Sequence, residues 1–190
     1  MQTTTSTSRD RERRFREIYD AAYVDVLRFV RRRVHPSHAE DVVGDVMLVV
    51  WRRLDDVPTD ASAARAWLFG VARKTLQNTR RREERRDAVA VRLADARGGL
   101  SDGGNDPDLV ALRADVAAAW PHLRVTEQET IALAALDGLT APEAAVVLGI
   151  SPTAFRLRLS RARRSLRRRL DRTTAGDSVP ARTVSDRSSR

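Results

Sequence analysis

The chain has 190 residues, a formal net charge of +9 and no cysteine. This length suits one or two small domains, and the strong positive charge suits a polyanionic partner such as nucleic acid. Disulfides and cysteine-ligated zinc are excluded, and no apolar run approaches the ~18 residues of a membrane span. Sustained period-2 alternation is absent, so we expect an all-α protein. Because the chain also has no cysteine and no apolar run of membrane-spanning length, we expect a cytoplasmic protein that does not insert into a membrane.

The N-terminal third contains two predicted helices. Residues 1–11 are polar and charged, so we expect them to be disordered. From residue 12, apolar residues at helical spacing predict a helix up to Val34, which ends before Pro36. Ser37 and Glu40 have the spacing of a capping box, which predicts the start of the next helix.

That next helix, about 38–54, is apolar around most of its circumference but carries acids in its first two turns. Glu40, Asp41 and Asp45 could simply complement the helix dipole. In a basic protein they could instead form a docking face for another protein, because their charge would repel DNA. The residues alone leave both interpretations open.

A loop at 55–63 precedes a third predicted helix, about 64–81. One face of this helix is apolar, and the remaining positions carry basic and amide side chains. Such side chains beside an aromatic residue suit a surface that follows the backbone of unpaired nucleic acid and stacks on its bases. The competing interpretation places Trp67 in the core.

Residues 98–107 are rich in glycine and polar residues, which predicts a flexible linker between two helical domains. The second domain opens with apolar residues on one helical face, namely Leu109, Leu112, Val116 and Trp120. Thr126 and Glu129 have capping-box spacing and head an apolar helix that ends at Gly138. The predicted segments are a disordered 1–11, a domain at 12–97, the linker at 98–107, a domain at 108–170 and a disordered tail at 171–190.

A helix-turn-helix is predicted inside the second domain. Thr140 and Glu143 form a capping box, and Gly149 follows the short helix where a left-handed residue ends a helix at little cost. Ser151 before Pro152 is a helix cap followed by proline in the first turn. The second helix of such a motif usually enters the DNA major groove.

This second helix separates apolar from basic side chains. The apolar stripe consists of Phe155, Leu159, Ala162, Leu166 and Leu170. Arginines occupy the other faces, and the competing interpretation is a solvated basic helix. Lys74 is the only lysine of the chain, so part of the arginine content could reflect coding bias.

Together these stretches resemble a bacterial RNA polymerase sigma factor of the small, two-domain extracytoplasmic-function (ECF) group, over roughly residues 12–170. Residues 39–51 are similar to the core-binding segment of that family, residues 65–73 to its −10 segment and residues 138–163 to its −35 domain. Three positions depart from the family pattern. Gly44 stands where glutamine is common, Leu157 stands where a small polar residue is common, and Ala141-Pro142 replaces a tyrosine-alanine pair.

The resemblance implies a non-enzymatic protein that binds core RNA polymerase and directs promoter-specific transcription initiation. It implies promoter DNA as the second partner, an anti-sigma protein as a common third, and neither cofactor nor metal. The implied polymerase contacts are Asp41, Val42, Asp45, Met47 and Trp51. The implied −10 DNA contacts are Arg65, Trp67, Arg73, Lys74 and Asn78. The implied −35 DNA contacts are Arg156, Leu157, Arg158, Ser160, Arg161 and Arg164.

Three other functions compete with this one, and the capped turn gives little support to the third, a structural RNA-binding protein. A stand-alone helix-turn-helix regulator would bind a symmetric operator as a dimer, but the acidic helix at 38–54 has no role in it. An enzyme would need a catalytic set, and the sequence shows no nucleophile–base pair, phosphate loop or metal-ligand cluster.

Overall fold

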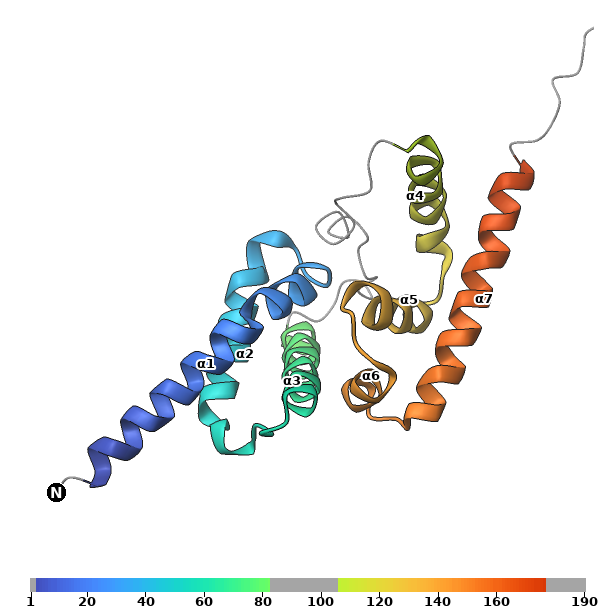
Figure 1. The fold of residues 1–190 in the computed structure, drawn as a ribbon. Helices are drawn as coiled ribbons and strands as arrows, with labels where there is room; N and C mark the ends of the chain where they lie inside the picture. The colour runs from blue at the N-terminus through green and yellow to red at the C-terminus, as the bar shows by residue number, and fades with distance from the viewer. Residues whose placement is uncertain (1–2, 83–105, 177–190) are drawn as a thin grey trace, which may run out of the picture.

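A computed structural model of the chain describes residues 3–82 and 106–176. These residues form two helical bundles (Figure 1). The first contains α1 (Thr3–Arg31), α2 (Ala39–Arg52) and α3 (Ala61–Arg82), and the second contains α4 (Pro107–Ala119), α5 (Val125–Ile131), α6 (Ala141–Leu148) and α7 (Pro152–Gly176). Short turns of 3₁₀-helix at Pro36–His38, Leu54–Asp56 and Trp120–His122, and a π-turn at Ala132–Leu136, connect them. None of the described helices is both long enough and apolar enough to cross a membrane.

The predicted segments differ from these bounds at their ends. Residues 98–105 of the predicted linker lie outside the described residues, and Asp106 and Pro107 already belong to α4, with Asp106 as its cap. Helix α7 continues to Gly176, past the predicted boundary at residue 170. Residues 177–190 of the predicted tail are outside the described part of the chain.

Helix α1 begins at Thr3, well before the predicted start at residue 12. Two arginines attach this early part of the helix to the last turn of α2 and to the segment that follows it. Arg11 donates to the Asp55 carboxylate at 2.8 Å and to the Trp51 carbonyl at 2.9 Å, and Arg14 donates to the Val57 carbonyl at 2.8 Å. Hydrogen bonds of this kind favour a helix that has no apolar stripe of its own, so composition alone could not reveal it.

Between α1 and α2 the predicted capping box does not form. The side chain of His35, rather than Ser37, accepts a backbone N–H, from Ser37 itself at 3.4 Å. Helix α2 then begins after His38, which makes no side-chain capping bond. The Glu40 carboxylate lies 3.7 Å from the Arg31 guanidinium instead of returning to the chain before it.

The core of the first bundle lies between α1, α2 and α3. Val26, Val46 and Val50 are fully buried. The rings of Phe29 and Phe69 meet edge to face with centroids 5.0 Å apart, a favourable aromatic geometry. This core holds α3 in place and thereby decides which of its side chains are exposed.

The second bundle has its own small core, but part of its predicted packing is wrong. Trp120, Leu123, Ile131, Ala132 and Ala162 are buried together. Leu109 and Leu112, expected on the packing face of α4, are 39% and 51% exposed.

The predicted Thr126–Glu129 capping box is also absent, because Glu127 caps α5. Its carboxylate accepts the Arg124 backbone N–H at 3.0 Å and the Arg124 guanidinium at 2.8 Å. The guanidinium hydrogen bond is the main reason that the pKa of Glu127 lies below its usual value.

The two bundles lie against each other, with α3 packed on α6 (Figure 1). Leu133, Leu139, Ala144 and Val147 of the second bundle belong to the same buried cluster as the core of the first. The arrangement is therefore closed, with apolar contact between the two predicted domains.

Candidate nucleic-acid interface

The helix-turn-helix has the local geometry that its residues predict. Thr140 donates its backbone N–H to the Glu143 carboxylate at 2.7 Å, and the Thr140 hydroxyl accepts the Glu143 N–H at 3.4 Å. Gly149 has φ 66° and ψ 38°, a left-handed conformation that glycine adopts without steric cost. The Ser151 hydroxyl accepts the Ala154 N–H at 3.1 Å and caps α7. These caps confirm the predicted turn and set the angle at which α7 leaves it.

Glu143 is buried in the first turn of α6. Burial raises the pKa of its carboxyl group, but hydrogen bonds from Thr140 and Ser62 and the charge of Arg65 outweigh that effect and leave the pKa below its usual value. The carboxylate therefore stays charged at neutral pH and keeps its capping role.

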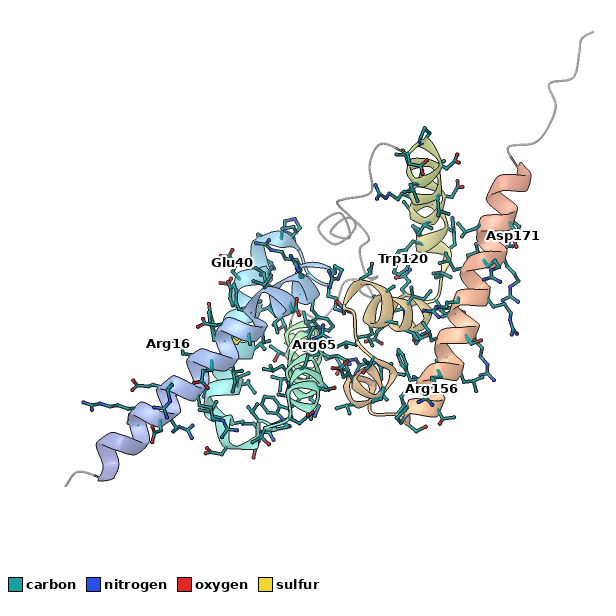
Figure 2. All side chains as sticks on the ribbon, in the orientation of Figure 1. Arg16, Glu40, Arg65, Trp120, Arg156 and Asp171 are labelled. Atoms are coloured by element: carbon teal, nitrogen blue, oxygen red, sulfur yellow. The ribbon has the colours of Figure 1, made fainter. Side chains whose placement is uncertain are left out.

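Helix α7 has the predicted division into a packing face and an exposed face. Phe155 and Ala162 are each 1% exposed, whereas the predicted −35 contacts are all exposed. Successive helical residues turn by about 100°, so five of these contacts share a face of about 140°. This set, called the α7 face below, consists of Arg156, Leu157, Ser160, Arg161 and Arg164. Arg158 lies beside it, and Figure 2 places Arg156 at the start of the helix.

The predicted −10 contacts do not share one basic face of α3, and that expectation is corrected. Arg65 and Arg73 point to the second bundle. Arg65 donates to the Asp137 carbonyl at 2.8 Å, and Arg73 pairs with Glu129 at 2.8 Å. Figure 2 shows Arg65 at the boundary between the bundles. The same turn of about 100° per residue puts the other three contacts on the opposite side.

This opposite side, called the α3 face below, consists of Trp67, Lys74 and Asn78. Lys74 and Asn78 are exposed, and Trp67 is half-buried. The Arg53 guanidinium lies 5.7 Å from the centre of the Trp67 ring and bonds the Asp56 carboxylate at 2.8 Å. Arg53 was not among the predicted contacts. The sequence signal for Arg53 is Asp56, an acidic residue three positions later that can pair with it.

The exposed face of α2 also differs from the prediction. Val42 is 3% exposed and Met47 is 6% exposed, so both belong to the core and offer no surface to a partner. Asp41 and Asp45 are exposed, and Leu48, which is 45% exposed, follows them on the same side of the helix. The exposed leucine could have been found from its i, i+4, i+7 spacing with the two acids.

Trp51, the fifth predicted polymerase contact, is half-buried. Its ring meets Phe15 edge to face with centroids 5.3 Å apart.

Together the α7 face, the α3 face and the exposed side of α2 can bind charged polymers and apolar surfaces without covalent chemistry. Among the described residues, no three histidine or acidic side chains are grouped as metal ligands would be.

Comparison with known families identifies both halves of the chain. Residues 18–86 match the family model of sigma-70 region 2, and residues 113–166 match that of sigma-70 region 4. The RNA polymerase sigma factor CnrH of Cupriavidus metallidurans is 36% identical over 143 residues, which cover 71% of this chain and 74% of CnrH. The ECF RNA polymerase sigma factor SigL of Mycobacterium tuberculosis is 31% identical over 154 residues, 80% of this chain and 86% of SigL.

Solved structures agree in fold. CnrH in complex with the cytosolic domain of CnrY superimposes with a TM-score of 0.56 at 28% identity, covering 85% of this chain and 90% of that one. RpoE of Bartonella quintana, in complex with the anti-sigma factor NepR, gives a TM-score of 0.54 at 22% identity over 85% and 97% of the two chains, which supports the fold alone. The chain therefore belongs to the extracytoplasmic-function group of the sigma-70 family, the sigma factors that direct promoter-specific transcription initiation by RNA polymerase.

Proposed function

We propose that this sigma factor reads a promoter with two separate surfaces, the α7 face at the −35 duplex and the α3 face at the unpaired −10 strand. The observation that carries the proposal is the capped helix-turn-helix, whose second helix exposes the α7 face. A helix presented in this way fits the width of the major groove.

At the −35 element, arginine and leucine would have different roles. An arginine guanidinium can donate two hydrogen bonds to the O6 and N7 atoms of guanine, and an apolar side chain can contact the thymine methyl group. Arg156 and Arg161 suit the first role, and the exposed Leu157 suits the second. Arg158, beside the α7 face, suits a phosphate.

At the −10 element, the α3 face offers an aromatic ring, a cation and an amide. Base stacking and backbone attraction are the two main contributions to binding single strands. The loop after Asp56 adjoins this face through Arg53 and would hold the strand with it. Strand opening would be driven by binding free energy, including capture of unstacked bases, so no nucleotide hydrolysis and no enzymatic activity are needed.

The polymerase-docking surface is proposed to be the exposed side of α2, with Asp41, Asp45 and Leu48 at its centre. The acids would speed and orient the encounter with a basic surface, and the leucine would contribute apolar contact. Two weak DNA contacts joined through one polymerase gain affinity by effective concentration. We further propose an anti-sigma partner, because the related structures are complexes with the cytosolic domain of CnrY and with the anti-sigma factor NepR. The cytosolic domain in the first complex also supports a cytoplasmic location for this chain.

Replacement of Arg156 or Arg161 by alanine tests the −35 assignment. Each change should cost ~1–3 kcal/mol of binding to the preferred −35 sequence and relax specificity at one position. Arg158→Ala is the matched control, because loss of a phosphate contact should weaken all sequences evenly and lower the salt dependence. The measurement is holoenzyme binding to a library of −35 sequences. An unchanged sequence preference in both Arg156→Ala and Arg161→Ala would exclude this placement.

A further inference from the structure

Helix α7 is longer than the α7 face requires. It ends at Gly176, whereas the part of the chain that matches sigma-70 region 4 ends at residue 166. Residues 163–172 contain six arginines and one aspartate, which give this stretch a strong net positive charge. Figure 2 shows Arg156 near the beginning of the helix and Asp171 near its other end. The far half of α7 therefore carries a second concentration of positive charge on the same rigid element.

The exposed arginines of this far half continue the α7 face. At about 100° per residue, Arg167 and Arg168 fall within the arc of about 140° that the α7 face occupies, and Arg172 falls about 20° beyond its edge. All three side chains are exposed. At about 1.5 Å per residue, Arg172 lies roughly 24 Å along the helix from Arg156. We call Arg167, Arg168 and Arg172 the distal arginines.

The distal arginines have no acidic partner. Within residues 3–82 and 106–176, no ion pair involves any of the three. An arginine that serves the packing of this fold is paired, as Arg73 is with Glu129 at 2.8 Å. Arg172 instead donates from Nε to the Arg168 carbonyl at 3.1 Å, which leaves both of its terminal amino groups for an anion.

The surface beside Arg168 and Arg172 is hollowed. Ser165, Arg168, Arg169 and Arg172 line a shallow hollow with a volume of about 480 Å³. A guanidinium group can donate two parallel hydrogen bonds to the oxygens of one phosphate, so arginine is favoured where phosphate is recognised. The hollow is therefore chemically suited to phosphate groups.

We infer that the distal arginines bind the phosphate backbone of the duplex that flanks the −35 element, which gives this sigma factor affinity that does not depend on base sequence. The inference rests on the proposed function, because it takes the α7 face to lie in the −35 major groove. In a helix-turn-helix, the N-terminal residues of the second helix contact the base edges. The major groove is about 12 Å wide, so basic side chains that continue roughly 24 Å beyond Arg156 reach the sugar–phosphate backbone at its edge.

A basic helix end also suits an acidic protein surface, but two observations favour DNA. The distal arginines continue the side of α7 that carries the proposed −35 contacts. Protein interfaces usually centre on large apolar or aromatic anchors. Within the described part of α7, Leu157 is the one large apolar side chain that is exposed, and it lies at the opposite end of the helix from the distal arginines.

The salt dependence of promoter binding tests the inference. Arg167→Gln with Arg168→Gln and Arg172→Gln removes three charges from exposed positions. Each phosphate contact contributes about 0.9 to the slope of log affinity against log salt concentration. The slope of the variant holoenzyme should be shallower by about 2.7, so its loss of affinity between about 50 and 200 mM salt should be roughly fortyfold smaller than that of the parent. Its preference among −35 sequences should be unchanged.

Two further variants are the controls. Arg9→Gln with Arg16→Gln and Arg28→Gln removes the same charge from exposed positions of α1 and should keep the salt dependence of the parent. Lysine at the three distal positions should also keep it, because an ammonium group attracts phosphate as a point charge. A guanidinium that reads a base with two hydrogen bonds would not be replaced by lysine in this way.

Site-directed cleavage locates the contact. The natural chain has no cysteine, so Asp171→Cys, at an exposed position, can carry a single tethered reagent that cuts nearby DNA strands. In the complex of holoenzyme and promoter, the cuts should fall in the duplex next to the −35 element. This experiment retains all three distal arginines, so it decides the question if the glutamine variant unfolds.

An unchanged salt slope in the folded glutamine variant, or no cleavage next to the −35 element, would overturn the inference. Weaker binding of that variant to core polymerase, with the salt slope of DNA binding unchanged, would overturn it in favour of an acidic protein surface. Absence of any −35 sequence preference in the parent holoenzyme would instead count against the proposed function.

Discussion

Gly44 lies in the middle of α2, exposed, and a Cβ atom placed there would meet nothing within 4 Å. Glycine in a helix interior costs ~1 kcal/mol relative to alanine. Gly44→Ala should therefore stabilise the chain by up to ~1 kcal/mol and raise the melting temperature by a few degrees. Thermal unfolding followed by circular dichroism measures this.

Gly149→Ala is the contrasting variant, because its φ of 66° strains any residue with a side chain. It should lower the melting temperature. A melting temperature that falls in Gly44→Ala would show that the flexibility of glycine is needed in α2.

Individual residues also show which local signals suffice for prediction. The Thr140–Glu143 box, the left-handed Gly149 and the Ser151 cap form as predicted because their partners are neighbours in sequence. The Thr126–Glu129 spacing is just as good, yet Glu129 turns to Arg73 on another helix. Local spacing cannot reveal a competing partner that comes from elsewhere in the fold.

At the scale of the element, α2 presents two acids and one leucine to solvent on the same side. Asp45→Arg lies past the first turn, so its effect on the helix dipole should be small and the fold should survive. Under the docking proposal, the folded variant should bind core polymerase at least tenfold more weakly, a loss of ~1.4 kcal/mol or more. Titration of labelled sigma factor with core polymerase measures this affinity for the parent and the variant.

Glu17→Arg is the control for that experiment, because it reverses an exposed charge on a different helix, α1. Retained weak affinity of the Asp45→Arg variant for −35 DNA would show that the second bundle is intact. Parental polymerase affinity in both Asp41→Arg and Asp45→Arg would place the docking surface elsewhere.

Helix α1 contributes a second element-scale effect through its early turns. Arg11 and Arg14 bond the last turn of α2 and the segment after it, which adjoins the α3 face, and each such hydrogen bond is worth ~0.5–1.5 kcal/mol. Arg11→Ala with Arg14→Ala should leave this segment less ordered and reduce promoter opening at least threefold. Permanganate reactivity of −10 thymines in the holoenzyme measures opening.

Arg13→Ala and Arg16→Ala are the matched controls on the same helix, since Arg13 pairs within α1 with Asp10 and Arg16 is exposed. Lysine at positions 11 and 14 should restore part of the opening. Loss of −35 occupancy together with opening would assign these arginines to general stability.

Among the elements, periodicity predicts the interiors well and the ends poorly. The α7 stripe packs as expected, because five apolar residues at helical spacing form one packing face, with Phe155 and Ala162 buried and the three leucines half-buried. The early start of α1 and the exposure of Leu109 and Leu112 depend on tertiary contacts, which no single segment encodes. The predicted −10 contacts lie on two sides of α3, and this division could have been predicted from the sequence. The positions of the five residues around the helix follow from the helical repeat alone.

At the scale of the whole molecule, the two domains were predictable and their contact was not. Composition identifies two helical segments on either side of residues 98–107. The ion pairs between the bundles join residues 56 to 105 positions apart, from Arg73 and Glu129 to Arg32 and Asp137. Such pairing leaves no periodic pattern in a chain with many arginines.

Initiation from purified components tests the central claim most directly. Core RNA polymerase alone, and with this sigma factor, would be supplied with a library of promoters and assayed for run-off transcripts. The account predicts discrete transcripts only when the sigma factor is present, from templates that share a −10 and a −35 element. No specific transcripts, together with tight binding of the pure protein to a symmetric duplex site, would contradict it and identify a stand-alone regulator.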